Sequence, residues 1–148
     1  MRPIEAPDLP SIVALDGKVT GIPKPNYFKE LYDLLGTGRR PERIILVAEE
    51  IGEIGEIGEI KGFVIGEVRE WVFGTPRCGW ITAIATEPAA RERGIASQLF
   101  ESISHAFHRA GADTIRTLPP RDDQTVVSFF RSQGMMAGPG IELERKLR

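Results

Sequence analysis

Residues 80–100 read WITAIATEPAARERGIASQLF, and this stretch decides the fold of the chain. Its first part is apolar and predicts a buried strand, which ends at Glu87-Pro88 because proline cannot donate to a sheet ladder and restricts the residue before it. From Ile95 onward, apolar residues recur at the spacing of one helix face, at positions 95, 96, 99, 100, 103, 106, 107 and 110. The stretch therefore predicts a strand, a short loop and an amphipathic helix.

The start of that helix predicts an anion site. The first N–H groups of a helix have no partner within it, and the helix dipole is positive there. Gly94 has no Cβ and Ala96 only a methyl group, so that a phosphate can approach the backbone closely. Arg91 and Arg93 add charged donors beside it. A pyrophosphate is the ligand that fits this pattern best.

These residues resemble the GNAT N-acetyltransferase superfamily, whose hallmark is Arg/Gln-x-x-Gly-x-Gly/Ala after a strand with a hydrophobic-x-Pro end. Arg91, Gly94 and Ala96 stand at the defining positions. The resemblance covers essentially the whole chain, most strongly residues 80–135, and implies a single domain over 1–148. It also implies an α/β fold in which a mixed, mostly antiparallel sheet of about six to seven strands is flanked by about four helices.

In the resembled family, the backbone amides of this loop bind the pyrophosphate of coenzyme A, and an unpaired strand N–H faces the thioester. Acetyl-CoA is therefore the expected cosubstrate, and no metal is expected. The positions that the resemblance assigns to its binding are Ile84, Ala85, Thr86, Arg91, Glu92, Arg93, Gly94, Ile95, Ala96, Asp123 and Phe130.

Composition indicates an ordinary globular protein. The chain has 148 residues, 41% hydrophobic residues and a net charge of −2, which gives no general case for binding nucleic acid or a membrane surface. No apolar run approaches the roughly 20 residues of a membrane helix, and the start shows no signal peptide. A single cysteine, Cys78, excludes an internal disulfide and, with two histidines, is poor material for a metal site. We expect a cytoplasmic protein.

The remaining pattern predicts further elements in order. Asp8 and Asn26 are expected to cap the first two helices, and Gly36 to end the second, whereas Asp122 and Asp123 are expected to cap the last helix. Three tandem Ile-Gly-Glu copies at 51–59 predict an extended hairpin connection. The strands are expected at 2–5, 43–49, 62–73, 78–85, 114–118 and 141–147, and the helices at 8–16, 27–35, 95–110 and 124–132.

The expected reaction is acetyl transfer to an amine, which attacks in its neutral form and needs a proton acceptor. No glutamate lies in strand 78–85, where some family members place a base, so Glu67 and Glu70 on the preceding strand are the candidates. Alternation puts them on opposite faces unless a bulge intervenes, and we favour Glu70. Family members often carry a tyrosine as general acid at the position of Phe130, which has no hydroxyl.

Other features leave alternatives open. The missing tyrosine and strand glutamate also fit a module that binds or senses acyl-CoA without catalysis. The acceptor, a small molecule or a peptide amine, cannot be read from the sequence, and the family pattern makes a homodimer an expectation. Weaker candidates are Lys24, Tyr27 and Phe28 for specificity, Trp71 and Trp80 for core or acceptor wall, and His105, His108 and Cys78, expected to be inert.

Overall fold

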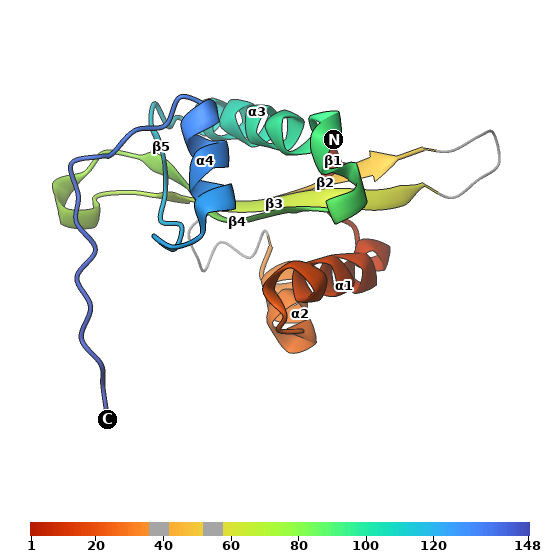
Figure 1. The fold of residues 1–148 in the computed structure, drawn as a ribbon. Helices are drawn as coiled ribbons and strands as arrows, with labels where there is room; N and C mark the ends of the chain where they lie inside the picture. The colour runs from red at the N-terminus through yellow and green to blue at the C-terminus, as the bar shows by residue number, and fades with distance from the viewer. Residues whose placement is uncertain (36–41, 52–57) are drawn as a thin grey trace. The chain divides into compact units, whose positions relative to one another are not determined.

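The computed structural model describes residues 1–35, 42–51 and 58–148, and the chain divides into two compact units, Met1–Leu118 and Pro119–Arg148. The first unit is built on a mixed five-stranded sheet (Figure 1). In the order of the sheet, the strands are β1 (Arg2–Pro3), β2 (Arg43–Glu50), β3 (Glu59–Arg69), β4 (Cys78–Thr86) and β5 (Ile115–Thr117). Strands β1 to β4 pair antiparallel, whereas β5 runs parallel to β4.

The α/β class is confirmed, but the prediction of six to seven strands is wrong for the residues that the structure describes. The predicted strand at 141–147 has no regular secondary structure and joins no sheet among the described residues, and Ile141, Leu143 and Leu147 are 83%, 89% and 89% exposed. Alternating apolar residues make a strand only where a neighbouring strand supplies hydrogen bonds and a core supplies a face to pack on. This segment belongs to the second unit, which contains one helix, α4 (Gln124–Ser132).

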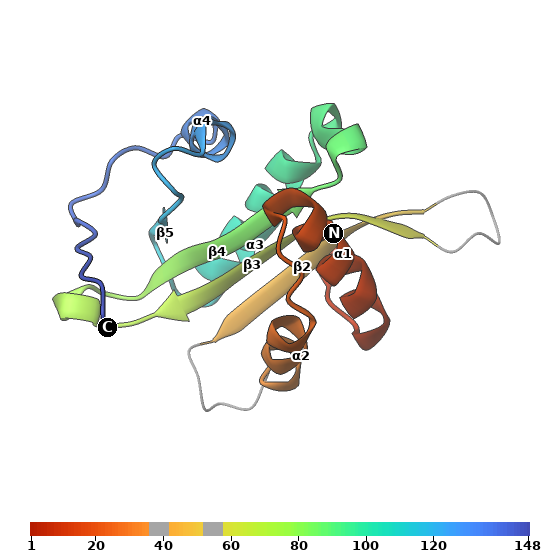
Figure 2. The same cartoon turned by 60° about the horizontal axis from the view of Figure 1, so that its bottom comes forward.

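The predicted four helices are present among the described residues. Helices α1 (Leu9–Thr20) and α2 (Pro25–Asp33) cover one face of the sheet, and α3 (Ile95–Arg109) covers the other (Figure 2). The first face forms the main core, where Phe28 packs edge-to-face on Phe63 with ring centroids 6.1 Å apart. Buried members of this core are Ile12, Leu15, Phe28, Leu31, Ile45, Val47, Phe63, Ile65 and Ala85.

Of the two caps predicted for the first two helices, Asp8 does stand at the N-cap position of α1 but does not cap it with its side chain, and Asn26 is not the N-cap of α2. Helix α1 begins at Leu9, and the Asp8 side chain makes no capping hydrogen bond to it. Helix α2 begins one residue before Asn26, at Pro25, because proline at the first helical position has no N–H that needs an acceptor. Helix α1 also continues to Thr20 and ends at Gly21 with φ 79°, whereas Gly36 and residues 52–57 of the repeat lie outside the described residues.

Helix α3 packs directly on glycines of the sheet. A Cβ added at Gly66 would lie 2.5 Å from Phe107 Cζ and 2.8 Å from Ile103 Cδ1, and one at Gly79 would overlap the Phe107 ring. A Cβ at Gly62 would lie 3.0 Å from Leu99 Cδ1. The three glycines therefore let α3 approach the sheet closely, with its apolar stripe buried as the helical spacing predicts.

A β-bulge changes the register of β4. Ile65 pairs with Ala83 and Gly66 with Ile81, so Thr82 is the extra residue. Beyond Arg69, β3 does not continue to Phe73 as predicted, because Trp71 (φ 59°) and Phe73 (φ 49°) turn the chain through a short 3-10 helix, Val72–Gly74. The bulge decides which side chains of β4 lie beside Glu67, and the early turn leaves Glu70 outside β3.

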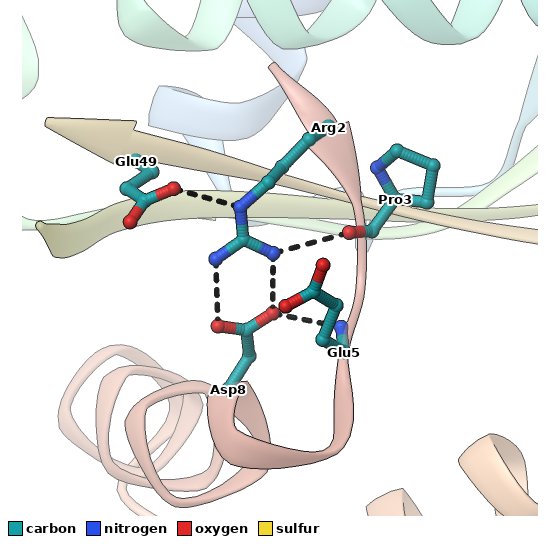
Figure 3. A network of polar contacts seen from close by, with 5 residues as sticks. All are labelled: Arg2, Pro3, Glu5, Asp8 and Glu49. Carbon is teal, nitrogen blue, oxygen red and sulfur yellow. Dashed lines mark hydrogen bonds and ion pairs between the residues drawn. The ribbon is translucent and has the colours of Figure 1, made fainter. Parts of the chain in front are cut away.

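The N-terminus is tied to the fold by a polar network (Figure 3). Arg2 donates to both Asp8 oxygens, at 2.7 and 2.9 Å, and through Nε to Glu49 at 2.7 Å. Asp8 also accepts from the Glu5 N–H at 2.8 Å. The hydrogen bonds from Arg2 hold the pKa of the buried Asp8 carboxyl below its usual value, and those to Asp8 and Glu49 raise the pKa of Arg2. The Asp8 carboxylate thus joins β1 to the start of α1 instead of capping it.

Candidate active site

The loop after β4 prepares the start of α3 for an anion. Residues Pro88–Arg93 form a 3-10 helix, and Gly94 reverses the chain with φ 75° before Ile95 begins α3. Gly94 stands at the N-cap position of this helix and has no side chain that could accept a hydrogen bond from the first N–H groups. A Cβ added at Gly94 would meet no atom within 4 Å, which leaves the backbone open to an approaching ligand.

Strand β4 has an open edge next to this helix start. Strand β5 pairs only with Gly79–Ile81, and its last residue, Thr117, stands opposite Ile81. Within the described sheet, the following residues of β4, Thr82 to Thr86, pair with β3 alone. Because N–H groups alternate along a strand, some of those between 82 and 86 point away from β3 into this opening. Ile84, Ala85 and Thr86, which the resemblance assigns to the thioester, lie on this part of β4.

We call residues 91–96, the end of the loop and the start of α3, the anion cradle. Its two arginines, Arg91 and Arg93, differ in their ion pairing. Arg93 forms a two-pronged ion pair with Glu50 at the end of β2, at 2.8 and 2.9 Å. This hydrogen bonding raises the pKa of Arg93 and lowers that of Glu50. Arg91 is exposed and has no ion pair with any described carboxylate. A hollow of about 230 Å³ beside Arg93 is lined by Lys61 and Gln98 and also by the carboxylates Glu49 and Glu50.

The two candidate bases have unequal positions. Glu70 lies beyond the end of β3, exposed and paired with Arg77, so the expectation that it sits on this strand is wrong. Glu67 lies on β3, on the face of Phe63 and Ile65 as alternation predicts. Its side chain is 13% exposed and is held by Arg69 at 2.6 Å and by Arg43 at 3.5 Å.

The register places a row of side chains across four strands that sequence reasoning missed. Arg43 pairs with Glu67, Glu67 with Trp80, and Trp80 with Arg116. The Arg69 guanidinium lies over the Trp80 ring, 4.8 Å from its centroid. Without the bulge at Thr82, simple alternation would put Trp80 on the face of Ile84, so the sequence held no direct signal for this row.

The weaker candidate residues differ in burial and in their contacts. Phe28 belongs to the core, whereas Tyr27 is 49% exposed and Trp71 68% exposed. Lys24 Nζ lies 2.7 Å from the buried Asp16 Oδ2, an ion-pair contact without hydrogen-bond geometry. His105 and His108 are exposed on α3 as expected. Burial raises the pKa of the Cys78 thiol, which makes it a poor nucleophile.

Asp123 and Phe130 belong to the second unit. Asp123 caps α4 as predicted, because its Oδ1 accepts from the Val126 N–H at 3.2 Å. Phe130 is buried, and its ring meets Phe129 edge-to-face with centroids 5.3 Å apart. Their assignment to acetyl-CoA binding rests on the resemblance.

Residues 1–35, 42–51 and 58–148 contain neither a cluster of metal-ligand side chains nor a helix of membrane-spanning type. Among them, no three His, Cys, Asp or Glu side chains are grouped as a metal site would require. None of the helices in these ranges is both long and apolar enough to cross a membrane.

Comparison with known proteins identifies the family. The sequence profile of the acetyltransferase (GNAT) family matches residues 10–135, which include the open β4 edge and the cradle. The chain belongs to the GNAT family. Among curated proteins, no significant match is found.

Solved structures of similar fold cover nearly the whole chain. AAC(6')-Iy, in complex with the bisubstrate analogue CoA-S-monomethyl-acetylneamine, aligns with a TM-score of 0.79 at 15% identity, over 99% of this chain and 97% of its own. The aminoglycoside 6'-N-acetyltransferase AAC(6')-Ih from Acinetobacter baumannii gives 0.78 at 17% identity, over 99% and 96%. A transcriptional regulator from Bacillus halodurans C-125 gives 0.75 at 19% identity, over 97% of both chains. At these identities the likeness concerns the GNAT fold.

Proposed function

We propose that this protein is an acetyl-CoA-dependent N-acetyltransferase, and that residues 1–148 act as one domain. The observation that carries the proposal is the start of α3, with Gly94 at its N-cap position, beside the edge of β4 that pairs only with β3 in the described sheet. A helix start binds the pyrophosphate, and an open strand edge offers N–H donors to a carbonyl oxygen. Membership of the GNAT family and a structural neighbour that holds a CoA-derived analogue support the same ligand.

Each part of the site has a role in this proposal. The backbone from Glu92 through Gly94 and Ile95 to Ala96 receives the pyrophosphate, with Arg91 as a charged donor. Arg93 joins them when it leaves Glu50. Edge N–H groups of Ile84, Ala85 and Thr86 face the pantetheine arm and the thioester. Asp123 and Phe130 are assigned to acetyl-CoA binding by the family pattern.

The proposed chemistry is direct attack in a ternary complex. The neutral amine of the acceptor forms the C–N bond, the C–S bond breaks, and the amine loses one proton while the departing thiolate gains one. An N–H of the β4 edge stabilises the oxyanion that develops between these steps. Phe130 cannot donate a proton, so we assign protonation of the thiolate to water or to the proton of the amine.

Of the two carboxylates, only Glu67 remains on the face that carries Ala83 and Ala85 of β4. Both of its oxygens are engaged by guanidinium groups, at 2.6 Å from Arg69 and 3.5 Å from Arg43. We therefore propose that Glu67 positions these arginines and that water accepts the amine proton. Glu70, outside the strand and paired with Arg77, has no assigned role.

Calorimetric titration of acetyl-CoA, CoA and ATP tests the cofactor assignment. Wild type should bind both CoA species at micromolar concentration and bind ATP far more weakly, and Gly94→Glu should abolish CoA binding because a carboxylate would occupy the anion position. Gly74→Glu is the matched control, since Gly74 (φ 76°) also has positive φ and no neighbour within 4 Å of an added Cβ. Equal effects of the two substitutions would point to backbone strain and count against the cradle.

A second function is favoured by Phe130 and by the absence of glutamate and aspartate from β4: an acyl-CoA-binding or sensing module without turnover. One assay distinguishes the enzyme from the module: release of free thiol from acetyl-CoA is measured in the presence of a library of small amines and peptides. Tight acetyl-CoA binding without thiol release would favour the module. A cytoplasmic location and a homodimer belong to the same proposal, and sedimentation equilibrium tests the dimer.

A further inference from the structure

The cross-strand row described above forms a charged surface on the sheet face opposite α3. We call it the arginine row and define it as Arg43, Glu67, Arg69, Trp80 and Arg116. Directly paired residues of adjacent strands lie on one face, so the register puts Arg43, Glu67, Trp80 and Arg116 side by side across β2 to β5. Arg69, two residues beyond Glu67 on β3, shares that face.

The charges of the row do not cancel. The row contains three guanidinium groups and one carboxylate. That carboxylate, Glu67, already forms ion pairs with Arg69 and Arg43. Arg116 is only partly exposed and makes no ion pair with any carboxylate that the structure describes. Its charge and that of Arg69 both act on the neighbouring Cys78, lowering a thiol pKa that burial raises more strongly. Burying part of an uncompensated guanidinium is costly unless a ligand supplies the counter-charge.

The row also contains a preorganised platform. Glu67 fixes Arg69 through Nε and Nη2, and the guanidinium is held over Trp80 at 4.8 Å from the ring centroid. An arginine fork held in place loses little freedom when it binds, and its geometry matches a carboxylate or phosphate.

The row lies close to the proposed reaction site. Trp80 is three residues before Ala83 on β4, which places it within about 10 Å of the open strand edge along the strand. One molecule can therefore reach from the row to the thioester position.

We propose that the arginine row binds an oxyanion carried by the acceptor, so that the substrate is an amine bearing a carboxylate or a phosphate, such as an amino acid, a peptide with a free C-terminus or a phosphorylated amine. That the ligand is an acetyl acceptor rests on the proposed function. That the row binds an anion rests only on the positions and charges of its residues. It sets this chain apart from its aminoglycoside-modifying structural neighbours, because aminoglycosides carry several amino groups that are protonated near neutral pH and that the row repels.

The fluorescence of Trp80 can report binding of a ligand to the arginine row. The chain has two tryptophans, so Trp71→Phe leaves Trp80 as the sole indole, and Trp71 is 68% exposed and outside the row. In this background, tryptophan fluorescence is titrated with alanyl-alanine, its C-terminal amide, phosphoethanolamine and kanamycin, with and without saturating CoA. Removal of one charge-assisted contact should weaken binding at least about tenfold. Alanyl-alanine, phosphoethanolamine or both should therefore bind at least about tenfold more tightly than the amide and kanamycin.

Arg116→Gln should abolish this preference, and Arg116→Lys should restore part of it. Arg109→Gln, an exposed arginine on α3, is the matched control and should change nothing. The ratio of dipeptide to phosphoethanolamine affinity assigns the oxyanion to a carboxylate or a phosphate. Equal binding of dipeptide and amide, preference for kanamycin, no response to either anionic amine, or an unchanged preference in Arg116→Gln would overturn the proposal. Failure of the acetyltransferase assignment appears separately, as absent CoA binding or absent thiol release.

Discussion

Arg93 and Glu50 form a two-pronged ion pair between the loop before α3 and the end of β2, at 2.8 and 2.9 Å. In the proposed site Arg93 is also a donor to the pyrophosphate. The carboxylate therefore competes with the ligand for one guanidinium. Both side chains are about half exposed, at 51% and 47%, so exchange of one partner for the other needs no rearrangement of the core.

Glu50→Gln should release Arg93 and tighten acetyl-CoA binding. Because exposed ion pairs are weak, the gain should be below about fivefold, and it should shrink as salt is added. Calorimetry at low and moderate ionic strength measures it. Glu101→Gln, which removes an exposed carboxylate from α3, controls for the change in net charge. Weaker binding in Glu50→Gln would mean that the ion pair orders the cradle instead of competing for it.

Glu67→Gln should raise the acceptor KM while kcat falls by less than about tenfold, because Glu67 positions Arg69 and Arg43. Removal of a general base would cost on the order of 10² to 10⁴ in rate. Steady-state kinetics across pH separate the two roles. A hundredfold loss of kcat together with disappearance of the acidic limb of the pH profile would make Glu67 the base.

Glu70→Gln is the companion variant and should leave both constants within about twofold, since Glu70 lies outside β3 and pairs with Arg77 at a surface position. A larger change in kcat would restore Glu70 as the candidate that sequence alternation favoured.

Asp8→Asn should destabilise the fold by about 1–3 kcal/mol near neutral pH, since it removes a carboxylate that holds Arg2 and the Glu5 N–H. The folded state lowers the pKa of Asp8 from 3.8. The stabilisation is therefore fully present above that value and disappears as pH falls through the lower folded-state pKa. Urea unfolding should show a smaller difference in the free energy of unfolding between wild type and Asp8→Asn at pH 3 than at pH 7. Asp113→Asn, at an exposed position, should leave the free energy of unfolding equal to that of wild type at both pH values.

Gly66→Ala should destabilise the protein by about 1–3 kcal/mol, because the new methyl group would overlap Phe107 and Ile103 of α3. The double variant Gly66→Ala with Phe107→Leu should be more stable than the sum of the two single changes predicts, which denaturant unfolding measures. Gly138→Ala, where an added Cβ meets no atom within 4 Å, is the control. Strict additivity would show that α3 does not press on Gly66.

The sequence by itself determined the local features of the site. The apolar run after Trp80, the proline that ends it, and Gly94 with Ala96 before a helical stripe are encoded within about 20 neighbouring residues. Backbone sterics and helix periodicity act over that range, so β4, the loop and α3 appear as predicted. Asp123 as the cap of α4 is local in the same way.

Tertiary structure alone decided which side chains share a face. Thr82 is one extra residue in β4, and it moves Trp80 from the face of Ile84 to the face of Glu67. The turn at Trp71 removes Glu70 from β3, and the register joins Arg43 to Glu67 and Arg116 to Trp80 over 24 and 36 positions of sequence. Strand pairing is fixed by packing between distant segments, and a shift of one residue exchanges the two faces, so no local pattern could reveal the arginine row.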